Sequence, residues 1–314
     1  MSSIPGHALV VGSVALDTIE TPFGRADSAL GGSATYFSAA ASIFCPVRLV
    51  GVVGADFPVD QLDFLRARGV DLAGLDRRDG ESFRWSGVYS YDLNSRETRE
   101  TRLGVFASFE PEIPAAFRDS EWVFLGNIDP ELQLDVLDQV HAPRLVACDT
   151  MNFWIEGKRD ALLALLRRVD LIVINDSEAR ELSGDHNLLR AARWIQSRGP
   201  DIVVVKKGEH GAILFTPDTI FFAPAYPLEE VFDPTGAGDA FAGGFIGYLA
   251  RAGSLGIDNL RRAVIYGSAL GSFAVERFSV ERLVDLDLGD VERRVAQFRE
   301  LTMFEEPVTA TRHG

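Results

Sequence analysis

The sequence predicts an α/β fold in which helices cover both faces of a mostly parallel, doubly wound sheet. Short apolar, β-branched runs indicate strands buried on both faces, and between them apolar residues recur at the three- and four-residue intervals of amphipathic helices. The predicted strands are residues 8–14, 47–52, 122–125, 145–147, 171–174 and 202–205. The predicted helices are residues 35–44, 61–68, 130–140, 159–168 and 188–198.

One region departs from this alternation. Residues 83–91 and 97–103 alternate like exposed strands around a turn at 92–95, which predicts a β-hairpin. A polar hairpin has no place in the core of an α/β domain, so we expect a lid or a clasp between two subunits; a surface excursion without function is the alternative. No repeat or linker divides residues 1–314, which predicts a single domain, and we expect the tail at 305–314 to be disordered.

The composition excludes several classes of function. Lysine and arginine number 31 against 46 aspartate and glutamate, and the net charge of -15 argues against nucleic acid as a partner. No apolar run approaches the roughly 20 residues of a membrane helix, and no signal peptide is expected. Cys45 and Cys148 lie far apart and the histidines share no ligand spacing, which disfavours disulfides and zinc. These features predict a cytoplasmic protein.

The most informative segment is DPTGAGDAF at residues 233–241, followed by AGGF at 242–245. Its second half is predicted to be helical, with a surface of small residues formed by Ala240, Gly243, Gly244 and Gly247. Each glycine costs a helix about 1 kcal/mol relative to alanine. Their pairing therefore indicates that another backbone approaches this helix closely.

Gly236, Ala237 and Gly238 precede this helix and form a loop whose N–H groups can converge at the positive end of the helix. Such a loop stabilises the negative charge that develops on a phosphoryl group. Asp239, at the helix entrance, is placed to accept a proton from a substrate hydroxyl. The alternative makes Asp239 only a helix cap and the glycines only a turn, but the length of the motif favours catalysis.

With this motif and GGSAT at residues 31–35, the chain resembles the ribokinase family of carbohydrate and nucleoside kinases, also called the PfkB kinases, over nearly its whole length. The resemblance implies a Rossmann-like three-layer α/β/α sandwich with a mostly parallel sheet and a small β lid, here about residues 15–30 and 83–105. It also implies ATP-dependent phosphoryl transfer, with Asp239 as general base and Gly236 to Gly238 as the anion hole.

The resemblance extends to the nucleotide side. Asn175 and Glu178 match the N-x-x-E element that organises Mg²⁺, its waters and the triphosphate, and outer-sphere carboxylates suffice for Mg²⁺. On the residues alone, Ser177 as the N-cap with Glu178 in the first helical turn explains the same segment. Lys206, Gly208 and Gly211 lie in VVVKKGEHG, which resembles the strand and turn beside ATP.

Three further residues are assigned by resemblance alone. Tyr266 is a candidate for the purine pocket, with core packing as its alternative. Asp233 and Thr235 match residues that help many members to bind an activating monovalent cation, so potassium joins ATP and Mg²⁺ among the expected cofactors.

The acceptor side is assigned in the same way. Asp17, in GSVALDTI, matches the family aspartate that hydrogen-bonds substrate hydroxyls, and Gly31 and Gly32 allow backbone to lie close to the substrate. Ser33 and Tyr36 complete this predicted acceptor site. Ribokinase-like members often carry asparagine at the positions of Ala15 and Tyr36, so the sequence departs from the family pattern for ribose.

The leading hypothesis is phosphorylation of a hydroxyl on a small sugar or polyol. The alternative is a nucleoside kinase of the adenosine-kinase type, which Tyr36 favours. A catalytically silent ligand sensor is a third reading, against which the intact Asp239 argues. A dehydrogenase is disfavoured because GSVALD, rather than GxGxxG, follows the first strand. A second copy of the chain, paired through the lid, is a further expected partner.

Overall fold

The computed structural model describes residues 6–93 and 95–303; the tail predicted to be disordered lies outside this range. Its central sheet has nine strands in the order β13-β12-β11-β10-β9-β8-β1-β4-β5. Neighbouring strands are parallel except in the pairs β11–β12 and β12–β13, which confirms the mostly parallel sheet. The strands are β1 (Ala8–Val11), β4 (Val47–Gly54), β5 (Asp71–Arg78), β8 (Trp122–Leu125), β9 (Leu145–Asp149), β10 (Leu171–Asn175), β11 (Ile202–Lys206), β12 (Ala212–Phe215) and β13 (Ile220–Ala223).

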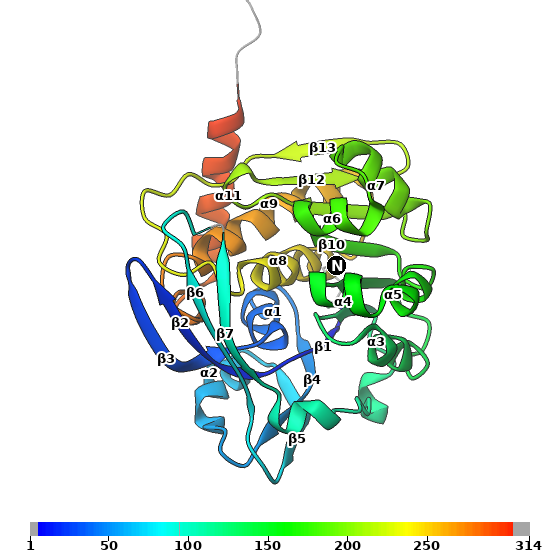
Figure 1. The fold of residues 1–314 in the computed structure, drawn as a ribbon. Helices are drawn as coiled ribbons and strands as arrows, with labels where there is room; N and C mark the ends of the chain where they lie inside the picture. The colour runs from blue at the N-terminus through cyan, green and yellow to red at the C-terminus, as the bar shows by residue number, and fades with distance from the viewer. Residues whose placement is uncertain (1–5, 94, 304–314) are drawn as a thin grey trace, which may run out of the picture.

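Helices cover both faces of this sheet, as predicted (Figure 1). On one face α1, α8, α9, α10 and α11 pack around a core that includes Phe37, Phe245 and Phe298. On the other, α3, α5, α6 and α7 pack around Leu162 and Ile195. The helices are α1 (Ser33–Ala41), α2 (Asp63–Ala67), α3 (Pro130–Leu137), α4 (Asn152–Gly157), α5 (Arg159–Leu166), α6 (Asp176–Ser183), α7 (Leu188–Gln196), α8 (Ala237–Ala252), α9 (Ile257–Ala274), α10 (Glu281–Val284) and α11 (Leu288–Thr302).

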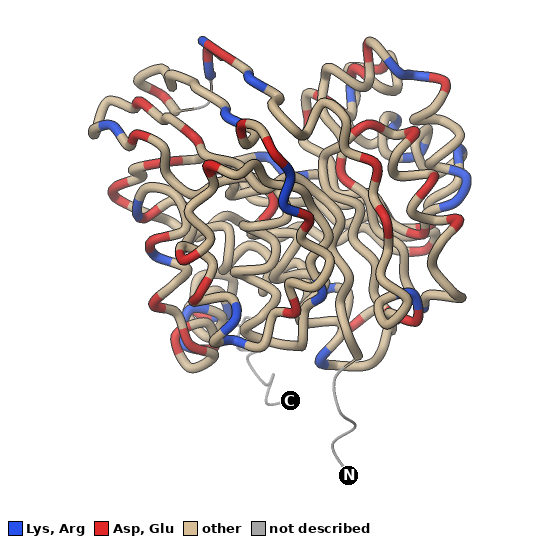
Figure 2. Tube along the Cα trace, turned by 90° about the horizontal axis from the view of Figure 1, so that it is seen from below, with Lys and Arg blue, Asp and Glu red and all other residues tan. Residues whose placement is uncertain are grey.

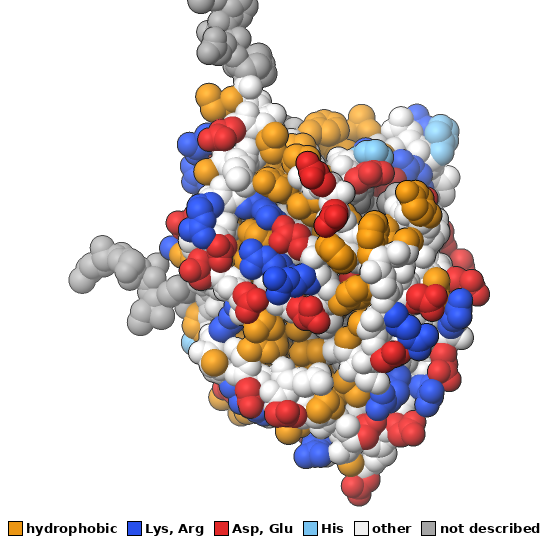
Figure 3. Space-filling model, turned by 90° about the vertical axis from the view of Figure 1, so that its left-hand side faces the viewer, with side chains coloured by type: hydrophobic (Ala, Val, Ile, Leu, Met, Phe, Trp, Pro, Cys, Tyr) orange, Lys and Arg blue, Asp and Glu red, His pale blue; other side chains and the backbone are white. Residues whose placement is uncertain are grey.

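A second sheet, which we call the lid sheet, has four strands in the order β3-β2-β6-β7. Its strands are β2 (Ala15–Thr21), β3 (Gly24–Gly31), β6 (Phe83–Tyr89) and β7 (Arg96–Arg102). β6 and β7 pair antiparallel, so the predicted hairpin is present, and β2 joins it in parallel to β6. Side chains of both signs gather on the face seen in Figure 3; within the lid sheet, Arg25 pairs with Asp27 and Arg102 with Glu100.

Some elements differ from the prediction. β5 and β13 were not predicted because they are the edge strands of the central sheet, where exposed positions interrupt the apolar run. β12, a four-residue strand that pairs antiparallel with β11, was also missed, as was the short helix α4. The helix predicted at 61–68 begins instead as a 3-10 turn, Val59–Leu62, continues as α2, and is followed by Gly69 at φ 80°.

The strand order indicates where a ligand binds. The chain leaves β1 for β4 and β5 on one side and later returns to β8, β9 and β10 on the other, so the order reverses between β1 and β8. In open α/β sheets, ligands bind outside the carboxyl ends of the strands at such a point. β1 leads there into the lid sheet, while β9, β10 and β11 end at Asp149, Asn175 and Lys206.

Charged residues lie mostly around the outside of the trace, and both signs are intermixed (Figure 2). Within the described range, none of the helices combines the length and the apolar character needed to cross a bilayer.

α8 lies between α1 and α9, and its glycines permit both contacts. A Cβ added to Gly243 would lie 2.4 Å from the carbonyl oxygen of Phe37 in α1, and one added to Gly244 would lie 2.9 Å from the carbonyl oxygen of Tyr266 in α9. Both distances are shorter than van der Waals contact. The small-residue surface predicted from the sequence is therefore a site of close helix packing, which holds the N-terminus of α8 in place.

We predict that Gly243→Ala destabilises the protein by about 1 to 3 kcal/mol, because the overpacking forces α1 and α8 apart, even though alanine favours a helix by about 1 kcal/mol. Urea unfolding measures this change. Gly157→Ala, whose Cβ meets no atom within 4 Å, is the control and should be close to neutral. Equal stability of the two variants would show that the α1–α8 contact has room to adjust.

Candidate active site

α8 begins at the loop that the sequence singles out. Gly236 has φ 73°, a left-handed conformation that favours glycine, and Asp239 lies in the first turn of α8. The free N–H groups at this end of the helix carry partial positive charge. The Asp239 side chain is only partly exposed, and burial together with repulsion from Asp149 raises its pKa to about 7. This carboxyl group can therefore exchange a proton near neutral pH.

Lys206, at the end of β11, brings a positive charge to the same loop. Its Nζ lies 3.5 Å from Oδ2 of Asp149, and a Cβ added to Gly238 would lie 2.7 Å from that nitrogen. Burial lowers the pKa of Lys206, but attraction to Asp149 and to Glu178 and Asp239 outweighs burial, so the net pKa is raised. Lys206 is thus a protonated amine that lies against the backbone of the predicted anion hole.

Asn175 caps α6 and Glu178 completes the cap. The Glu178 N–H donates to Oδ1 of Asn175 at 2.8 Å, and the Asn175 N–H donates to Oε2 of Glu178 at 3.0 Å. The expectation that Ser177 is the N-cap is therefore wrong: Ser177 lies inside the first turn, and its hydroxyl donates to Asn175. Burial and repulsion from Asp149 raise the pKa of Glu178 to about 7.

These carboxylates fit a divalent cation held through water. Within residues 6–93 and 95–303, no three His, Cys, Asp or Glu side chains meet to hold a metal ion directly. Glu178 and Asp149 are buried, and burial raises the pKa of each, so a nearby cation would stabilise their charged forms. Mg²⁺ keeps several of its waters and needs few direct protein ligands.

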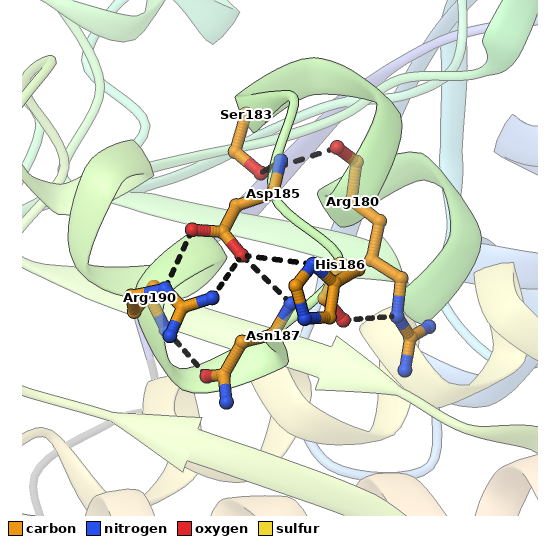
Figure 4. Close-up of polar contacts among 6 residues, drawn as sticks. All are labelled: Arg180, Ser183, Asp185, His186, Asn187 and Arg190. Atoms are coloured by element: carbon orange, nitrogen blue, oxygen red, sulfur yellow. Dashed lines mark hydrogen bonds and ion pairs between the residues drawn. The ribbon is translucent and has the colours of Figure 1, made fainter.

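The loop between α6 and α7 fixes the far end of α6 (Figure 4). Asp185 accepts hydrogen bonds from Nε and Nη2 of Arg190 at 2.7 and 2.9 Å, and Arg180 of α6 donates to the carbonyl oxygen of His186 at 3.1 Å. The hydrogen bond from Arg190 lowers the pKa of Asp185 to about 2. These contacts hold α6 against α7, so Glu178 keeps its position at the start of α6.

Asp17 lies on β2 at the other side of the cleft. It is 5% exposed, and a Cβ added to Gly31 would lie 2.0 Å from its Oδ2. Gly32 has φ 94°, and its added Cβ would lie 2.4 Å from the carbonyl oxygen of Ser13. Burial, followed by repulsion from Asp233 and Asp239, raises the pKa of Asp17 to about 7. Asp17 and both glycines are therefore packed together, and their role in binding the acceptor stays a prediction.

Tyr36 joins the acceptor side to the loop before α8. A Cβ added to Gly236 would lie 2.3 Å from three atoms of the Tyr36 ring, so the ring packs flat against that glycine. Tyr36 is 1% exposed, and its hydroxyl has no hydrogen-bond partner within the described residues. Burial, then the charges of Asp233 and Asp17, raise its pKa. A buried donor without a partner suits a ligand oxygen in this cleft.

Two further predicted site residues, Ser33 and Tyr266, make their described contacts within the protein. The Ser33 hydroxyl accepts from the Ser13 N–H at 3.2 Å and the Ser33 N–H donates to the Ser13 hydroxyl at 3.0 Å, so its polar groups join α1 to the end of β1. Tyr266 stacks on Tyr248 with ring centroids 4.3 Å apart, and its backbone lies beside Gly244, well inside α8. These contacts fit core packing, the alternative stated for Tyr266, and its assignment to the purine pocket stays a prediction.

Asp233 and Thr235 tie the loop to its surroundings. The N–H groups of Thr235 and Ser279 donate to the two oxygens of Asp233 at 2.8 and 2.9 Å. Ser279, at φ 56°, also donates its hydroxyl to the carbonyl oxygen of Leu30 on β3. The Thr235 hydroxyl donates to the phenol oxygen of Tyr89 on the lid sheet at 3.0 Å. The loop before α8 is thus bonded to both the lid sheet and the α9–α10 turn.

The turn after β11 opens onto a pocket. Gly208 and Gly211 have φ 54° and 85°, and a Cβ on Gly211 would lie 2.0 Å from the carbonyl oxygen of Ala223, so both positions favour glycine. The adjoining open pocket has a volume of about 580 Å³. Its lining includes Lys207, His210, Ala212, Phe222, Pro224 and Leu301. This mostly apolar surface suits a flat base next to the charged cluster around Lys206.

The sequence assigned no role to three residues that the structure brings to the cleft. Asp149 ends the buried strand β9, and a polar residue at the carboxyl end of such a strand was the available signal. The Thr150 hydroxyl beside it is buried without a partner in the described chain. The alternating pattern of β6 predicts a strand at Tyr89. Its contact with Thr235 joins residues 146 positions apart, and no local pattern indicates such a contact.

Comparisons with known proteins agree with this arrangement. Residues 10–285 match the family model described as pfkB family carbohydrate kinase. A cytidine kinase of Thermococcus kodakarensis is 31% identical over 249 residues, covering 77% of this chain and 88% of that protein.

Two solved structures share the fold. The nucleoside kinase of Burkholderia thailandensis in complex with inosine has a TM-score of 0.76 and 21% identity, covering 94% of this chain and 98% of that one. A putative ribokinase II from E. coli has a TM-score of 0.79 and 20% identity, covering 93% of this chain and 99% of that one. The predicted sandwich with a lid is confirmed.

The raised pKa of Asp239 predicts a stability effect with a definite sign. The folded chain keeps this proton up to a pKa of about 7, whereas an unfolded aspartate releases it near about 4. Stability is therefore lost as pH rises through that window. Asp239→Asn removes this loss. The free energy of unfolding of the variant should therefore exceed that of wild type by about 1 to 3 kcal/mol at pH 8, and by less at pH 5.

Thermal unfolding at the two pH values tests this expectation. Asp185→Asn is the control: because the pKa of Asp185 is lowered to about 2, this variant should lower the melting temperature equally at pH 5 and pH 8. An Asp239→Asn variant that is less stable than wild type at pH 8 would contradict the assigned environment of Asp239.

Proposed function

The chain belongs to the pfkB family of carbohydrate kinases, and from that membership we propose that it phosphorylates a hydroxyl of a nucleoside with ATP. It is an ATP-dependent phosphotransferase with an alcohol as acceptor, as the sequence predicted. The sequence prediction of a small sugar or polyol fits the family. The nucleoside, stated there as the alternative, is the acceptor that we favour.

One observation carries the proposed chemistry: Asp239 lies at the N-terminus of α8, with Lys206 against the same loop and Asp17 across the cleft. In the proposed step the acceptor oxygen forms a bond to the γ-phosphorus while the bond from that phosphorus to the bridging oxygen breaks. ADP leaves with the bond's electron pair, and Asp239 takes the acceptor's proton. Gly236, Ala237 and Gly238 would stabilise the transferred group through their N–H groups.

In the proposed complex, ATP lies at the carboxyl ends of the strands. Lys206 would bind phosphate oxygens, and Gly208 and Gly211 would let the backbone approach ATP. The base would lie in the pocket lined by Phe222 and Pro224. Mg²⁺, held through water by Glu178 and the neighbouring cap residue Asn175, would neutralise triphosphate charge when bound.

Two features favour a nucleoside on the acceptor side. Trp85 is paired in register with Asp17, so both project to the cleft face of the lid sheet. The Trp85 ring lies over Gly87, where an added Cβ would fall 2.2 Å from it, and its Nε1 donates to Thr98 at 3.3 Å. This half-buried ring offers a flat surface to a base, while Asp17 can accept hydrogen bonds from sugar hydroxyls. The cytidine kinase relative supports the same class.

A monovalent cation remains part of the proposal. Asp233 is fully buried, and none of the ion pairs in the described chain involves it. Its carboxylate accepts hydrogen bonds from two backbone N–H groups and from the Thr235 side chain, and a cation such as potassium near Asp233 and Thr235 would stabilise its charge further.

The pairing of two subunits through the lid stays a prediction. The lid sheet's other face carries an open pocket of about 300 Å³. Its lining includes Thr18, Arg84, Glu100 and Arg102.

We predict turnover with a nucleoside. ADP release by the purified protein should be measured with Mg-ATP and cytidine, uridine, adenosine, inosine, ribose, fructose and inositol, with and without potassium, and the product identified by mass spectrometry. The proposal expects kcat/KM for one nucleoside to exceed that of every sugar by about tenfold or more, as expected when a pocket contact to the base is worth about 1.4 kcal/mol. Faster turnover of a sugar would instead support the sugar-kinase reading, and tight binding without turnover would support a sensor.

Asp239→Asn should lower kcat by about 10²- to 10⁴-fold, the usual contribution of a positioned base. In wild type, kcat/KM should fall as pH drops below about 7, because the raised pKa leaves Asp239 protonated there. Steady-state rates between pH 5.5 and 9 measure both effects. Asp258→Asn, which changes an exposed aspartate in the first turn of α9, is the control and should turn over like wild type. Near-normal turnover by Asp239→Asn would remove Asp239 from the base role.

A further inference from the structure

Arg96, the first residue of β7, lies on the cleft face of the lid sheet. It is paired in register with Tyr89 on β6, and side chains of such a pair project to the same side of a sheet. Tyr89 faces the cleft, because its phenol oxygen accepts a hydrogen bond from Thr235 in the loop before α8. Arg96 therefore points from the lid towards the catalytic loop.

The contacts of Arg96 fix where its charge lies. Its guanidinium carbon is 5.5 Å from the centre of the Trp85 ring, which itself projects beside Asp17. Burial raises the pKa of Tyr89, and the guanidinium of Arg96 opposes that rise. The planar cation thus lies between two cleft-facing aromatic residues of the lid sheet, close to the substrate side.

The same charge reaches carboxylates from three separate elements. Burial raises the pKa of Asp17 on β2, Glu178 on α6 and Asp239 on α8, and the positive charge of Arg96 opposes each rise. Asp17 marks the acceptor side, Glu178 the nucleotide side, and Asp239 the point between them. The register with Tyr89 and the contact with Trp85 place Arg96 on the side of the lid sheet that faces these three groups.

The body of the protein supplies limited positive charge to this path. The cations that act on Asp239 are Lys206 and Arg96, and Lys206 is already paired with Asp149. A nucleoside triphosphate brings several negative charges, which must be matched where the γ-phosphoryl group transfers. Arg96 is exposed; its guanidinium stacks near Trp85 and shares a hydrogen bond with Tyr89. Because a guanidinium carries five N–H donors, others remain for a ligand.

We propose that Arg96 is a catalytic residue supplied by the lid, whose guanidinium donates hydrogen bonds to the γ-phosphoryl oxygens during transfer. This proposal rests on the kinase function proposed above. As the acceptor oxygen bonds to phosphorus and the bridging bond breaks, charge remains on the equatorial oxygens and grows on the departing ADP; Asp239 receives the acceptor's proton. A guanidinium fork matches phosphate oxygens in geometry and charge.

In this proposal, the role of Arg96 depends on the Tyr89–Thr235 hydrogen bond. It joins the strand beside Arg96 to the anion-hole loop, so the guanidinium reaches the phosphoryl group while the lid sheet is bonded to that loop. Transfer is then favoured when the lid encloses an acceptor, and hydrolysis of ATP by water in an open cleft lacks the same cation.

The test compares Arg96→Met, Arg96→Lys and Arg96→Ala with Arg99→Met, which removes the same charge from an exposed position of the same strand. With wild-type turnover established, Arg96→Met should lower kcat by about 10²-fold or more, the effect of losing one donor to a developing charge. Arg96→Lys should retain intermediate activity, and added guanidinium should restore part of the activity of Arg96→Ala. Arg99→Met should stay close to wild type.

A second measurement separates catalysis from folding and from substrate binding. Calorimetry should show that Arg96→Met binds ADP as wild type does but binds ADP with aluminium fluoride, a mimic of the transferring group, at least about tenfold more weakly. Equal affinities for that mimic would overturn the proposal, as would a raised acceptor KM with unchanged kcat. Absence of wild-type turnover with every acceptor would instead refute the kinase proposal, whatever Arg96 does.

Discussion

A single lysine among buried carboxylates sets the conditions for the rest of the site. Lys206 is paired with Asp149, while Glu178 and Asp239 arrive from α6 and α8, and burial raises the pKa of all three acids. One lysine cannot neutralise three acids, so each further positive charge near this cleft stabilises their charged forms. The fold has to hold these groups together against their repulsion, and the helices behind them do so.

The helix that carries Asp239 is held by close contacts on both sides. Gly243 meets the backbone of α1 and Gly244 meets that of α9, so α8 cannot slide or rotate without a clash. At its start, the ring of Tyr36 from α1 lies against Gly236. The wall of the proposed acceptor pocket and the proposed anion-hole loop therefore share one contact. In the proposed reaction, an acceptor that moves Tyr36 would act directly on the loop, which would link the choice of acceptor to the geometry of transfer.

Much of this arrangement could be predicted from the sequence, because its signals are local. Buried strands such as β8 show as apolar runs, and the DPTGAGDAF segment specifies a turn, an acid and a small-residue helix within a few positions. Edge strands such as β5 gave no such run. Asp149 and Arg96 were missed since their neighbours lie far away in the chain. Ser177 was misplaced because α6 begins two residues earlier than that cap implies, with Asn175 as its N-cap. Asparagine and serine are both favoured as N-cap residues, so N-cap preference could not choose between Asn175 and Ser177.

The bond from Ser279 to Leu30 spans 249 positions of sequence, and it has a consequence for how the protein is made. Ser279 also binds Asp233, so the loop that precedes α8 is held by a residue synthesised after it. A ribosome adds about 5 to 20 residues per second, N-terminus first. The lid strands and most of the sheet thus exist for seconds before the last tether of the loop appears. The growing chain can fold its scaffold in that interval, but the loop before α8 reaches its final form only after Ser279 has been synthesised.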